Sequence, residues 1–151
     1  MLDATDLRIL RALQDLPEAS IEEVGRAAGI SHTPCWRRIR RMQEEGVIRG
    51  RAYQFDPKAI GLGITVITMT KLDRHDEAAL GAFEREAGKL AEIVECYLVT
   101  GAYDYALKIV TRDMEAFETF LKTRLSNLPH VGDMHSTVVM RRVKDDGRLP
   151  I

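Results

Sequence analysis

The sequence is poor in the features that mark secreted and membrane proteins. It contains only two cysteines, and Cys35 and Cys96 both fall among apolar residues, so we expect reduced, buried thiols rather than a disulfide framework. No apolar run approaches the ~18 residues that a membrane-spanning helix needs. The first residues, MLDATDLRIL, lack the basic and apolar regions of a signal peptide. We therefore expect a cytoplasmic chain with no membrane partner.

Recognisable catalytic and metal-binding patterns are also missing. Of the histidines, only His32 has a cysteine nearby, and the pair of His32 and Cys35 lacks the further ligands that a zinc site requires. Neither a nucleophile elbow nor a glycine-rich phosphate loop occurs. We expect no catalytic residues, no metal site and no cofactor, and we do not expect an enzyme.

The net charge is small, but positive charge is concentrated in one short stretch. The whole chain has a formal net charge of −1. Residues 1–30 hold three arginines and six acidic residues, whereas residues 31–51 hold six arginines and two acidic residues. A local excess of this kind is typical of a nucleic-acid contact. A single copy would make few phosphate contacts and bind weakly at cellular salt, so we expect a dimer or a larger assembly.

Residues 20–50 have the pattern of two short helices joined by a tight turn. Ser20 and Glu23 have the spacing of a capping box, in which each side chain accepts the other residue's backbone amide. Gly29 can end this helix in a left-handed conformation. Ser31 can cap the next helix, and Pro34 is tolerated in its first turn. Two helices with a short glycine-containing turn are typical of a helix-turn-helix motif.

The second helix of this pair separates apolar from cationic residues. At helical periodicity, Cys35, Ile39 and Met42 share one narrow sector and are expected to face the core. The opposite side carries Thr33, Arg37, Arg40 and Arg41, with Arg38 at its flank. Such a helix can enter the major groove of double-stranded DNA. Arginine runs on helices are more often solvated faces, so the DNA interpretation depends on the capped helix and turn that precede this one.

Another helix and a linker flank this pair. Asp3 with Asp6 can start a first helix, whose apolar side would be formed by Leu7, Leu10 and Leu13. After residue 50, the alternation of Arg51, Tyr53 and Phe55 predicts a short strand, and a proline and two glycines follow it. We therefore expect a helix-turn-helix domain at 1–50, a linker strand and hinge at 51–62, and a second domain at 63–151.

The second domain has the order βαββαβ. Runs rich in Ile, Val and Thr alternate with segments that carry one apolar stripe at helical spacing. The expected strands are Ile64–Lys71, Ile93–Val99, Tyr105–Val110 and His135–Val143, and the expected helices are Asp76–Leu90 and the segment from Asp113 to Leu128. This order is that of the ferredoxin-like fold, an antiparallel sheet with both helices on one side. The chain as a whole is expected to be of the α+β class.

Both faces of the predicted sheet carry apolar residues. Ile67 and Met69 have the opposite parity to Ile64 and Val66 in the first strand. Because helices cover only one face of this fold, the apolar residues on the other face predict a second subunit over it. A homodimer would also supply the second DNA-binding helix that the charge argument requires.

The turn between the two central strands has the parts of a small ligand site. Gly101 offers exposed backbone amides to a carboxylate, Asp104 offers an acidic group to an ammonium, and Tyr103 and Tyr105 flank them. These are the requirements for binding a free amino acid. An ordinary Gly-Asp hairpin turn explains the same residues, and from these residues alone it is the favoured interpretation.

Four segments together resemble the Lrp/AsnC family of leucine- and asparagine-responsive transcription regulators. They are LDATDLRILRALQ, ISHTPCWRRIRRMQEEGVIRG, ECYLVTGAYDYALKI and MHSTVVMRRVKD, in the family's order and spacing. The resemblance covers essentially the whole chain. It implies an N-terminal winged-type helix-turn-helix domain, a linker strand and a C-terminal ferredoxin-like effector domain. It further implies dimers that assemble into tetramers or octamers, with a small amino acid bound between dimers.

The resemblance also assigns residues to sites. Together with the exposed helix face, it gives as DNA-binding residues Ser31, His32, Thr33, Pro34, Arg37, Arg38, Arg40 and Arg41. It gives as effector-binding residues Leu98, Gly101, Tyr103, Asp104, Met114, Thr137, Val138 and Val139. The sequence departs from the family pattern at Trp36, where a smaller aliphatic residue is usual, and at Ala102, where many relatives have a polar or acidic residue. Trp36 could pack over the rim of the core or stack on DNA.

Three functions are compatible with these patterns. The first is a sequence-specific transcription regulator that responds to an amino acid bound between dimers. The second is an architectural protein that wraps DNA without an effector. The third, disfavoured by the helix-turn-helix pattern, is a small ferredoxin-like enzyme or ligand-binding module.

Overall fold

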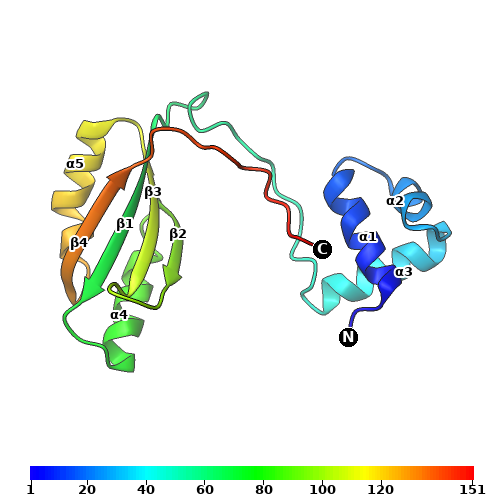
Figure 1. The fold of residues 1–151 in the computed structure, drawn as a ribbon, viewed down its shortest axis with the longest axis horizontal. Coiled ribbons are helices and arrows are strands. Elements are labelled where there is room, and N and C mark those ends of the chain that lie inside the picture. The colour runs from blue at the N-terminus through cyan, green and yellow to red at the C-terminus, as the bar shows by residue number, and fades with distance from the viewer. The chain divides into compact units, whose positions relative to one another are not determined.

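The computed structural model describes residues 1–151, and contacts divide them into two units (Figure 1). The first unit comprises Met1–Tyr53 together with Lys144–Ile151, and the second comprises Gln54–Val143. We expected the whole of 63–151 in the second domain, but the last residues pack on the first unit. No helix is long and apolar enough to cross a bilayer.

The first unit contains three helices whose ends are set by local capping. They are α1 (Ala4–Asp15), α2 (Ile21–Ala28) and α3 (His32–Glu44). The predicted capping box of Ser20 with Glu23 is formed at α2, and Asp3 with Asp6, predicted to start the first helix, forms a second capping box at α1. Gly29 ends α2 with φ 73°, a left-handed conformation that costs glycine little.

The core of the first unit lies where the three helices meet. Ile9, Val24, Cys35 and Met42 are completely buried there. The buried stripe of α1 consists of Asp6, Ile9 and Ala12, so the expected stripe of three leucines was wrong. Those leucines are only partly buried: they line a groove beside α3, and Leu10 and Leu13 also pack against the edge of the core. The aspartate on the buried stripe had obscured the helical pattern.

A glycine lets α2 approach the start of α3 closely. Gly25 is buried, and a Cβ atom at this position would lie 2.9 Å from the carbonyl oxygen of Ile30 and 3.3 Å from Cβ of Cys35. Such distances are shorter than van der Waals contact, so only glycine fits without a shift of the turn. This contact brings the turn and the first residues of α3 against α2.

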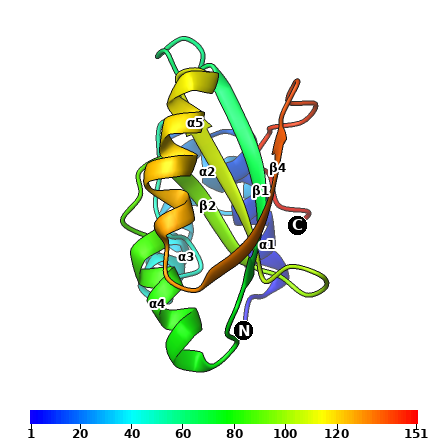
Figure 2. The ribbon, with the colours of Figure 1, turned by 90° about the vertical axis from the view of Figure 1, so that its left-hand side faces the viewer.

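The second unit is the expected ferredoxin-like arrangement (Figures 1 and 2). Its antiparallel sheet has the strand order β2-β3-β1-β4, and α4 and α5 lie on one side of it. The side chains of Asp76 and Asp113 cap the two helices by accepting backbone amides, at the residues where the sequence predicted each helix to begin. The elements are β1 (Ile64–Leu72), α4 (Glu77–Ala87), β2 (Ile93–Leu98), β3 (Tyr105–Thr111), α5 (Met114–Thr123), the short 3-10 helix η1 (Leu125–Asn127) and β4 (Val131–Val138).

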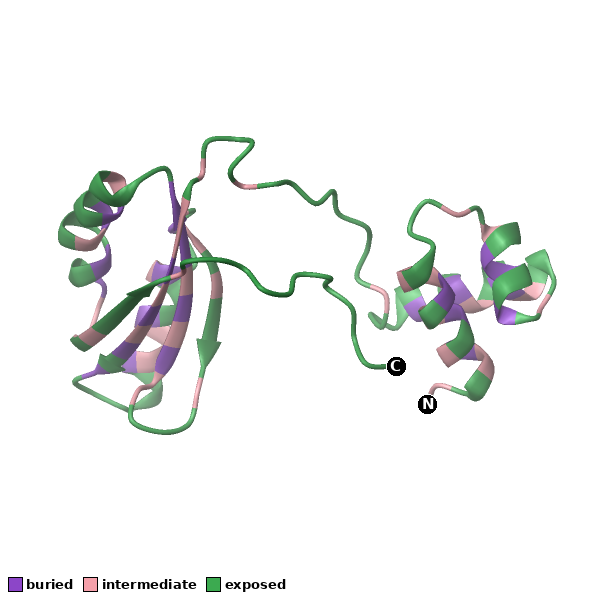
Figure 3. Cartoon of the chain, turned by 45° about the horizontal axis from the view of Figure 1, so that its top comes forward, coloured by how far each residue is buried: buried purple, intermediate pink, exposed green.

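Alternate residues of the central strands form the core of this unit (Figure 3). Val66, Leu107 and Ile109 are buried against the helices. The ring of Tyr105 lies 4.5 Å from that of Phe83 on α4, centroid to centroid. The Tyr105 hydroxyl donates to the Glu84 carboxylate at 2.8 Å, which satisfies the one polar atom of an otherwise buried side chain.

Within this unit, no helix covers the opposite face of the sheet (Figure 2). Ile67 and Met69 lie on it and are half-buried, beside the ion pair of Lys108 with Glu95 at 2.7 Å. The sheet therefore has apolar residues on both faces, as the alternation predicted, but packing within the chain protects only one of them.

Three further expectations were wrong for reasons of strand pairing. Residues 51–55 form no strand, because no segment of the chain pairs with them, and the side chain of Tyr53 is 89% exposed. The last strand begins and ends earlier than expected, since its only neighbour, β1, begins at Ile64 and the final pairing bond runs from the Val139 amide to the Thr65 carbonyl. Cys96 is exposed because β2 is an edge strand.

Candidate nucleic-acid interface and effector site

The first turn of α3 offers uncommitted polar groups. Ser31, His32 and Thr33 are exposed, and Pro34 is partly buried. Ser31 has the extended backbone of a cap residue, but its side chain makes no capping hydrogen bond, so the predicted Ser31 cap is not formed. The hydroxyl therefore remains available. No acidic residue occupies this turn, and the helix dipole gives it partial positive charge that suits a phosphate.

Two of the four predicted arginines are held by carboxylates of α1. Nη1 of Arg38 lies 2.6 Å from Oδ2 of Asp3 and 2.8 Å from Oδ1 of Asp6. Nη2 of Arg41 lies 2.6 Å from the other oxygen of Asp6. Although both arginines are on the predicted face, their charged groups are directed to the first helix.

The other two arginines of α3 are more accessible. Arg37 is exposed and forms no hydrogen bond or ion pair within the chain. Arg40 pairs with Glu44 at 3.1 Å and lies over the ring of Trp36, 5.5 Å from its centroid. The Arg40 and Glu44 side chains are each more than 60% exposed, and exposed pairs of this kind contribute at most about 1 kcal/mol. A DNA phosphate could replace Glu44 at little cost.

The sequence analysis did not identify the role of Asp6. Its side chain is completely buried, and burial alone would raise the pKa of its carboxyl group. Hydrogen bonds from the Asp3 amide and from Arg38 and Arg41 outweigh burial and lower the pKa to about 2. One sequence signal could have revealed this role. Asp6 lies three positions before Ile9 and therefore on the same buried side of the helix, and a buried carboxylate needs cationic or hydrogen-bonding partners.

Trp36 lies at the edge of a groove between α1, α3 and the C-terminal segment. The groove has a volume of about 1180 Å³, and Leu10, Leu13, Leu149 and Ile151 also line it. The Trp36 side chain is 42% exposed. One side of the indole therefore faces this groove and the guanidinium of Arg40, and the remainder is open to solvent.

In the second unit, the predicted effector turn is organised around Asp104. Its Oδ2 atom accepts the Leu72 amide at 2.8 Å and lies 3.1 Å from Nε2 of His75. Gly101 has φ 120°, which favours glycine, and Leu98 at the end of β2 is 62% exposed. His75 was missed because it lies far from the turn in sequence. Asp104 therefore secures the end of β1 with one oxygen and leaves the other without a hydrogen bond.

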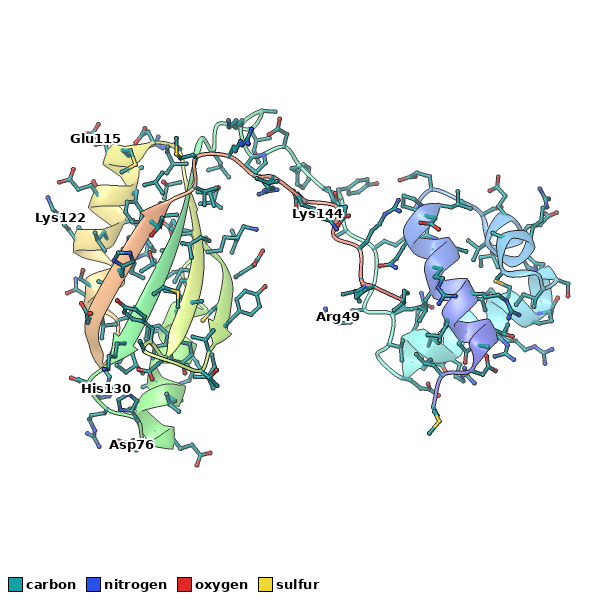
Figure 4. All side chains as sticks on the ribbon, in the orientation of Figure 1. Arg49, Asp76, Glu115, Lys122, His130 and Lys144 are labelled. Carbon is teal, nitrogen blue, oxygen red and sulfur yellow. The ribbon has the colours of Figure 1, made fainter.

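The remaining predicted effector residues lie at the opposite end of the sheet. Val138 pairs with Val66, six positions along β1 from Leu72, which corresponds to roughly 20 Å at about 3.3 Å per residue. Figure 4 shows the same separation, with Glu115, which follows Met114, at one end and Asp76 at the other. Thr137 and Val139 lie beside Val138. One chain therefore does not bring the eight predicted residues into one cluster.

No three or more side chains of His, Cys, Asp or Glu are placed to hold a metal ion. The histidines are dispersed: His75 contacts Asp104, and His130 lies 3.4 Å from Asp73. His32 is exposed on α3, whereas Cys35 is buried, so this pair does not converge on a common point.

Comparison with known proteins agrees with the two units. Residues 65–149 match the model of the Lrp/AsnC ligand binding domain, and residues 2–49 match that of a winged helix-turn-helix DNA-binding domain. The chain belongs to the Lrp/AsnC family of DNA-binding transcription regulators. The resemblance seen in the sequence and the expected α+β fold are thereby confirmed.

Several Lrp/AsnC relatives match along nearly their whole length. The leucine-responsive regulatory protein of Escherichia coli (strain K12) is 37% identical over 150 residues, which are 99% of this chain and 92% of that protein. A proline dehydrogenase transcriptional activator of Rhizobium radiobacter is 35% identical over 146 residues, 97% of this chain and 94% of that one.

Solved structures of Lrp/AsnC proteins share the fold. An AsnC family transcriptional regulator from Agrobacterium tumefaciens has a TM-score of 0.90 at 33% identity, covering 99% of this chain and 97% of that one. A transcriptional regulator from Neisseria meningitidis, solved as a complex with L-Met, has a TM-score of 0.91 at 29% identity with the same coverage.

Proposed function

We propose that this Lrp/AsnC protein is a homo-oligomeric, sequence-specific regulator whose DNA binding responds to a small amino acid. The observation that carries the proposal is the surface of α3. Arg37 is exposed there without a partner, one turn from the uncommitted groups of Ser31, His32 and Thr33. Residues in the first turns of a recognition helix are those that reach base edges in helix-turn-helix complexes.

The DNA surface in this proposal consists of the residues that no carboxylate of α1 holds. Arg37 donates to a base edge or phosphate in the major groove, and Arg40 exchanges Glu44 for a phosphate. The N-terminal end of the helix, which would approach the DNA first, consists of Ser31, His32, Thr33 and Pro34. The two positive charges of Arg38 and Arg41 are already paired with the carboxylates of Asp3 and Asp6.

Two independent observations support a homodimer. The uncovered sheet face carries Ile67 and Met69, and a second copy would remove this apolar surface from water. One α3 helix with two accessible arginines makes too few phosphate contacts for firm binding at cellular salt, whereas two helices double the electrostatic contribution. Higher assembly into tetramers or octamers belongs to the same proposal.

The effector site requires more than one chain. The turn with Leu98, Gly101, Tyr103 and Asp104 and the group around Val138 lie at opposite ends of one sheet. A ligand that touches both groups must therefore lie between chains. The free oxygen of Asp104 suits an ammonium and the amides beside Gly101 suit a carboxylate. The complex of one structural neighbour with L-Met supports an amino acid as the ligand class.

The group around Val138 would supply the selectivity for the effector side chain. Met114 is 48% exposed and Val138 is 41% exposed, and both are apolar. A ligand bound between dimers can change regulation only if its affinity differs between the alternative assemblies of the protein, because that difference shifts the equilibrium between them. Small apolar amino acids, including methionine, are thus the first candidates.

The test uses the full chain and DNA from its own promoter region. Binding is measured by fluorescence anisotropy at fixed salt with and without each common amino acid, and the assembly size by light scattering. We expect preference for the promoter fragment over a scrambled fragment, and one amino acid that raises the melting temperature. At about 100 times its dissociation constant, a ligand adds ~2.7 kcal/mol of stability. Equal binding to both fragments, or a lone subunit in solution, contradicts the proposal.

An architectural protein would behave differently in the same experiments. It would give long, phased footprints on DNA and no change of melting temperature with any amino acid. If both results were observed, the proposed function would be that of a DNA-wrapping protein and not that of an effector-responsive regulator.

A further inference from the structure

A buried acid of α1 holds two arginines of the recognition helix. Asp6 is completely buried, and each of its carboxylate oxygens accepts a hydrogen bond from a different arginine, Arg38 at 2.8 Å and Arg41 at 2.6 Å. The Asp3 amide donates to the same carboxylate at 3.0 Å. The two arginines lie almost one turn apart on α3, so the Asp6 carboxylate binds this helix at two points along its length.

These pairs differ in kind from the other ion pairs of α3. Arg40 and Glu44 are both largely solvated, and their separation costs little. Release of Arg38 and Arg41 would leave the Asp6 carboxylate buried without its cations, which is unfavourable because a buried charge needs ionic or hydrogen-bonding partners. DNA phosphates compete poorly for arginines that are held in this way.

The same contact restricts the rotation of α3 about its own axis. Rotation of α3 would break both hydrogen bonds together, because Arg38 and Arg41 each contact a different oxygen of the same buried carboxylate. Arg37, which makes no hydrogen bond or ion pair within the chain, precedes Arg38 directly, lies one turn before Arg41 and is exposed.

We propose that Asp6 is a positioning residue for DNA recognition, which keeps Arg38 and Arg41 on α1 and thereby presents Arg37 to the duplex. This inference rests on the proposed DNA-binding function. Asp6 itself does not touch DNA. By withholding two cations from phosphates, it lowers sequence-independent affinity and so increases the ratio of specific to non-specific binding.

The inference has a measurable signature in the salt dependence of binding. Each phosphate contact contributes about 0.9 to the slope of log affinity against log salt for duplex DNA. In Asp6→Asn, Arg41 loses its closest carboxylate, whereas Arg38 keeps its pair with Asp3. We expect tighter binding to a scrambled fragment, a steeper slope by about 1 per subunit, and a smaller ratio of promoter to scrambled affinity.

Two control variants separate this effect from charge and from stability. Glu18→Gln removes the same charge from an exposed residue of the first unit that pairs with no cation. Ile9→Val loosens the core beside Asp6 without touching the arginines. Both should keep the wild-type slope. An unchanged slope in folded Asp6→Asn, or an equal change in Glu18→Gln, overturns the inference.

A second comparison retains Asp6 and remains decisive if Asp6→Asn fails to fold. Arg37→Gln and Arg41→Gln remove the same charge from positions one turn apart on α3, and Arg38 still pairs with Asp6 in both. We expect Arg37→Gln to weaken promoter binding about tenfold or more and to reduce the salt slope by about 1. Arg41→Gln should leave the slope unchanged, and an equal loss of slope in both variants contradicts the inference.

The outcomes also separate this inference from the proposed function. If the wild-type protein shows no preference for its promoter fragment, the proposed regulator is wrong. If the wild-type protein shows that preference and the two arginine variants behave alike, only the role of Asp6 is wrong.

Discussion

Gln14 holds the backbone of Leu149 through both groups of its side-chain amide. Its Nε2 atom donates to the Leu149 carbonyl at 3.2 Å, and its Oε1 atom accepts the Leu149 amide at 2.7 Å. Arg148 pairs with Asp15 at 2.9 Å beside this contact. The end of the chain is therefore docked on α1 by three specific contacts, and it borders the apolar groove that contains Trp36.

The first prediction concerns this docking. Gln14→Ala removes two hydrogen bonds, each worth about 0.5–1.5 kcal/mol, and should release the C-terminal segment locally without unfolding the helices. Amide hydrogen exchange at Leu149 is expected to become roughly tenfold faster, since its donor loses its acceptor. Gln43→Ala serves as the control, because Gln43 is exposed and its side chain makes no hydrogen bond. Equal exchange at Leu149 in wild type and Gln14→Ala would show that this pair does not hold the segment.

The second prediction tests the close approach of α2 to α3. Gly25→Ala places a methyl group 2.9 Å from the Ile30 carbonyl oxygen and should destabilise the first unit by about 1–3 kcal/mol. Gly81→Ala is the matched substitution in α4, where the added group meets only the mobile end of Arg85 at 3.3 Å. That variant should be neutral or gain about 0.5–1 kcal/mol from helix propensity. Urea denaturation followed by far-UV circular dichroism measures both, and stabilisation by Gly25→Ala would refute the packing argument.

Local features of the fold were predictable because a few neighbouring residues decide them. The capping pairs at Asp3 and Ser20, the caps at Asp76 and Asp113, and the βαββαβ order all follow from side-chain spacing. The ends of β4 were not predictable in this way. They depend on where the neighbouring strand β1 begins, which is information that lies far away in the sequence.

The candidate site shows the same limit. The exposed face of α3 could be predicted from helical periodicity, but the carboxylates that hold Arg38 and Arg41 lie more than thirty residues earlier. Asp6 serves at once as a capping residue and as the partner of both arginines, and the sequence pattern reveals only the first role. Similarly, Gly101 and Asp104 suggested a ligand turn, whereas the distance between that turn and Val138 could be obtained only from the strand register.

The third prediction concerns the pH dependence of stability. The pKa of Asp6 is about 2 in the folded chain, against an ordinary value of 3.8, so the unfolded chain takes up this proton first as the pH falls. The contribution of Asp6 is therefore fully present above about pH 4, is lost progressively towards pH 2, and amounts to about 2 kcal/mol. Unfolding free energies of wild type and Asp6→Asn, followed by Trp36 fluorescence, should have different pH slopes in this interval. If the two stability curves were parallel, the pKa of Asp6 would be the same in the folded and the unfolded chain, which contradicts the prediction.

The fourth prediction separates the structural role of Asp104 from its role in the proposed effector site. Asp104→Asn retains an oxygen that can accept the Leu72 amide, but it removes the charge that would bind an ammonium. We expect the variant to fold and to bind promoter DNA as the wild type does, while the melting temperature no longer rises with the amino acid found for the wild type. Asp104→Ala, which also leaves the Leu72 amide without an acceptor, should in addition lose about 1–3 kcal/mol of stability.

Asp73→Asn is the control for this prediction, since it changes an exposed acid near the same end of the sheet that does not contact the turn. A full amino-acid response in Asp104→Asn would exclude the Asp104 charge from effector binding, whereas loss of response in Asp73→Asn as well would point to a general effect of charge at that end of the sheet.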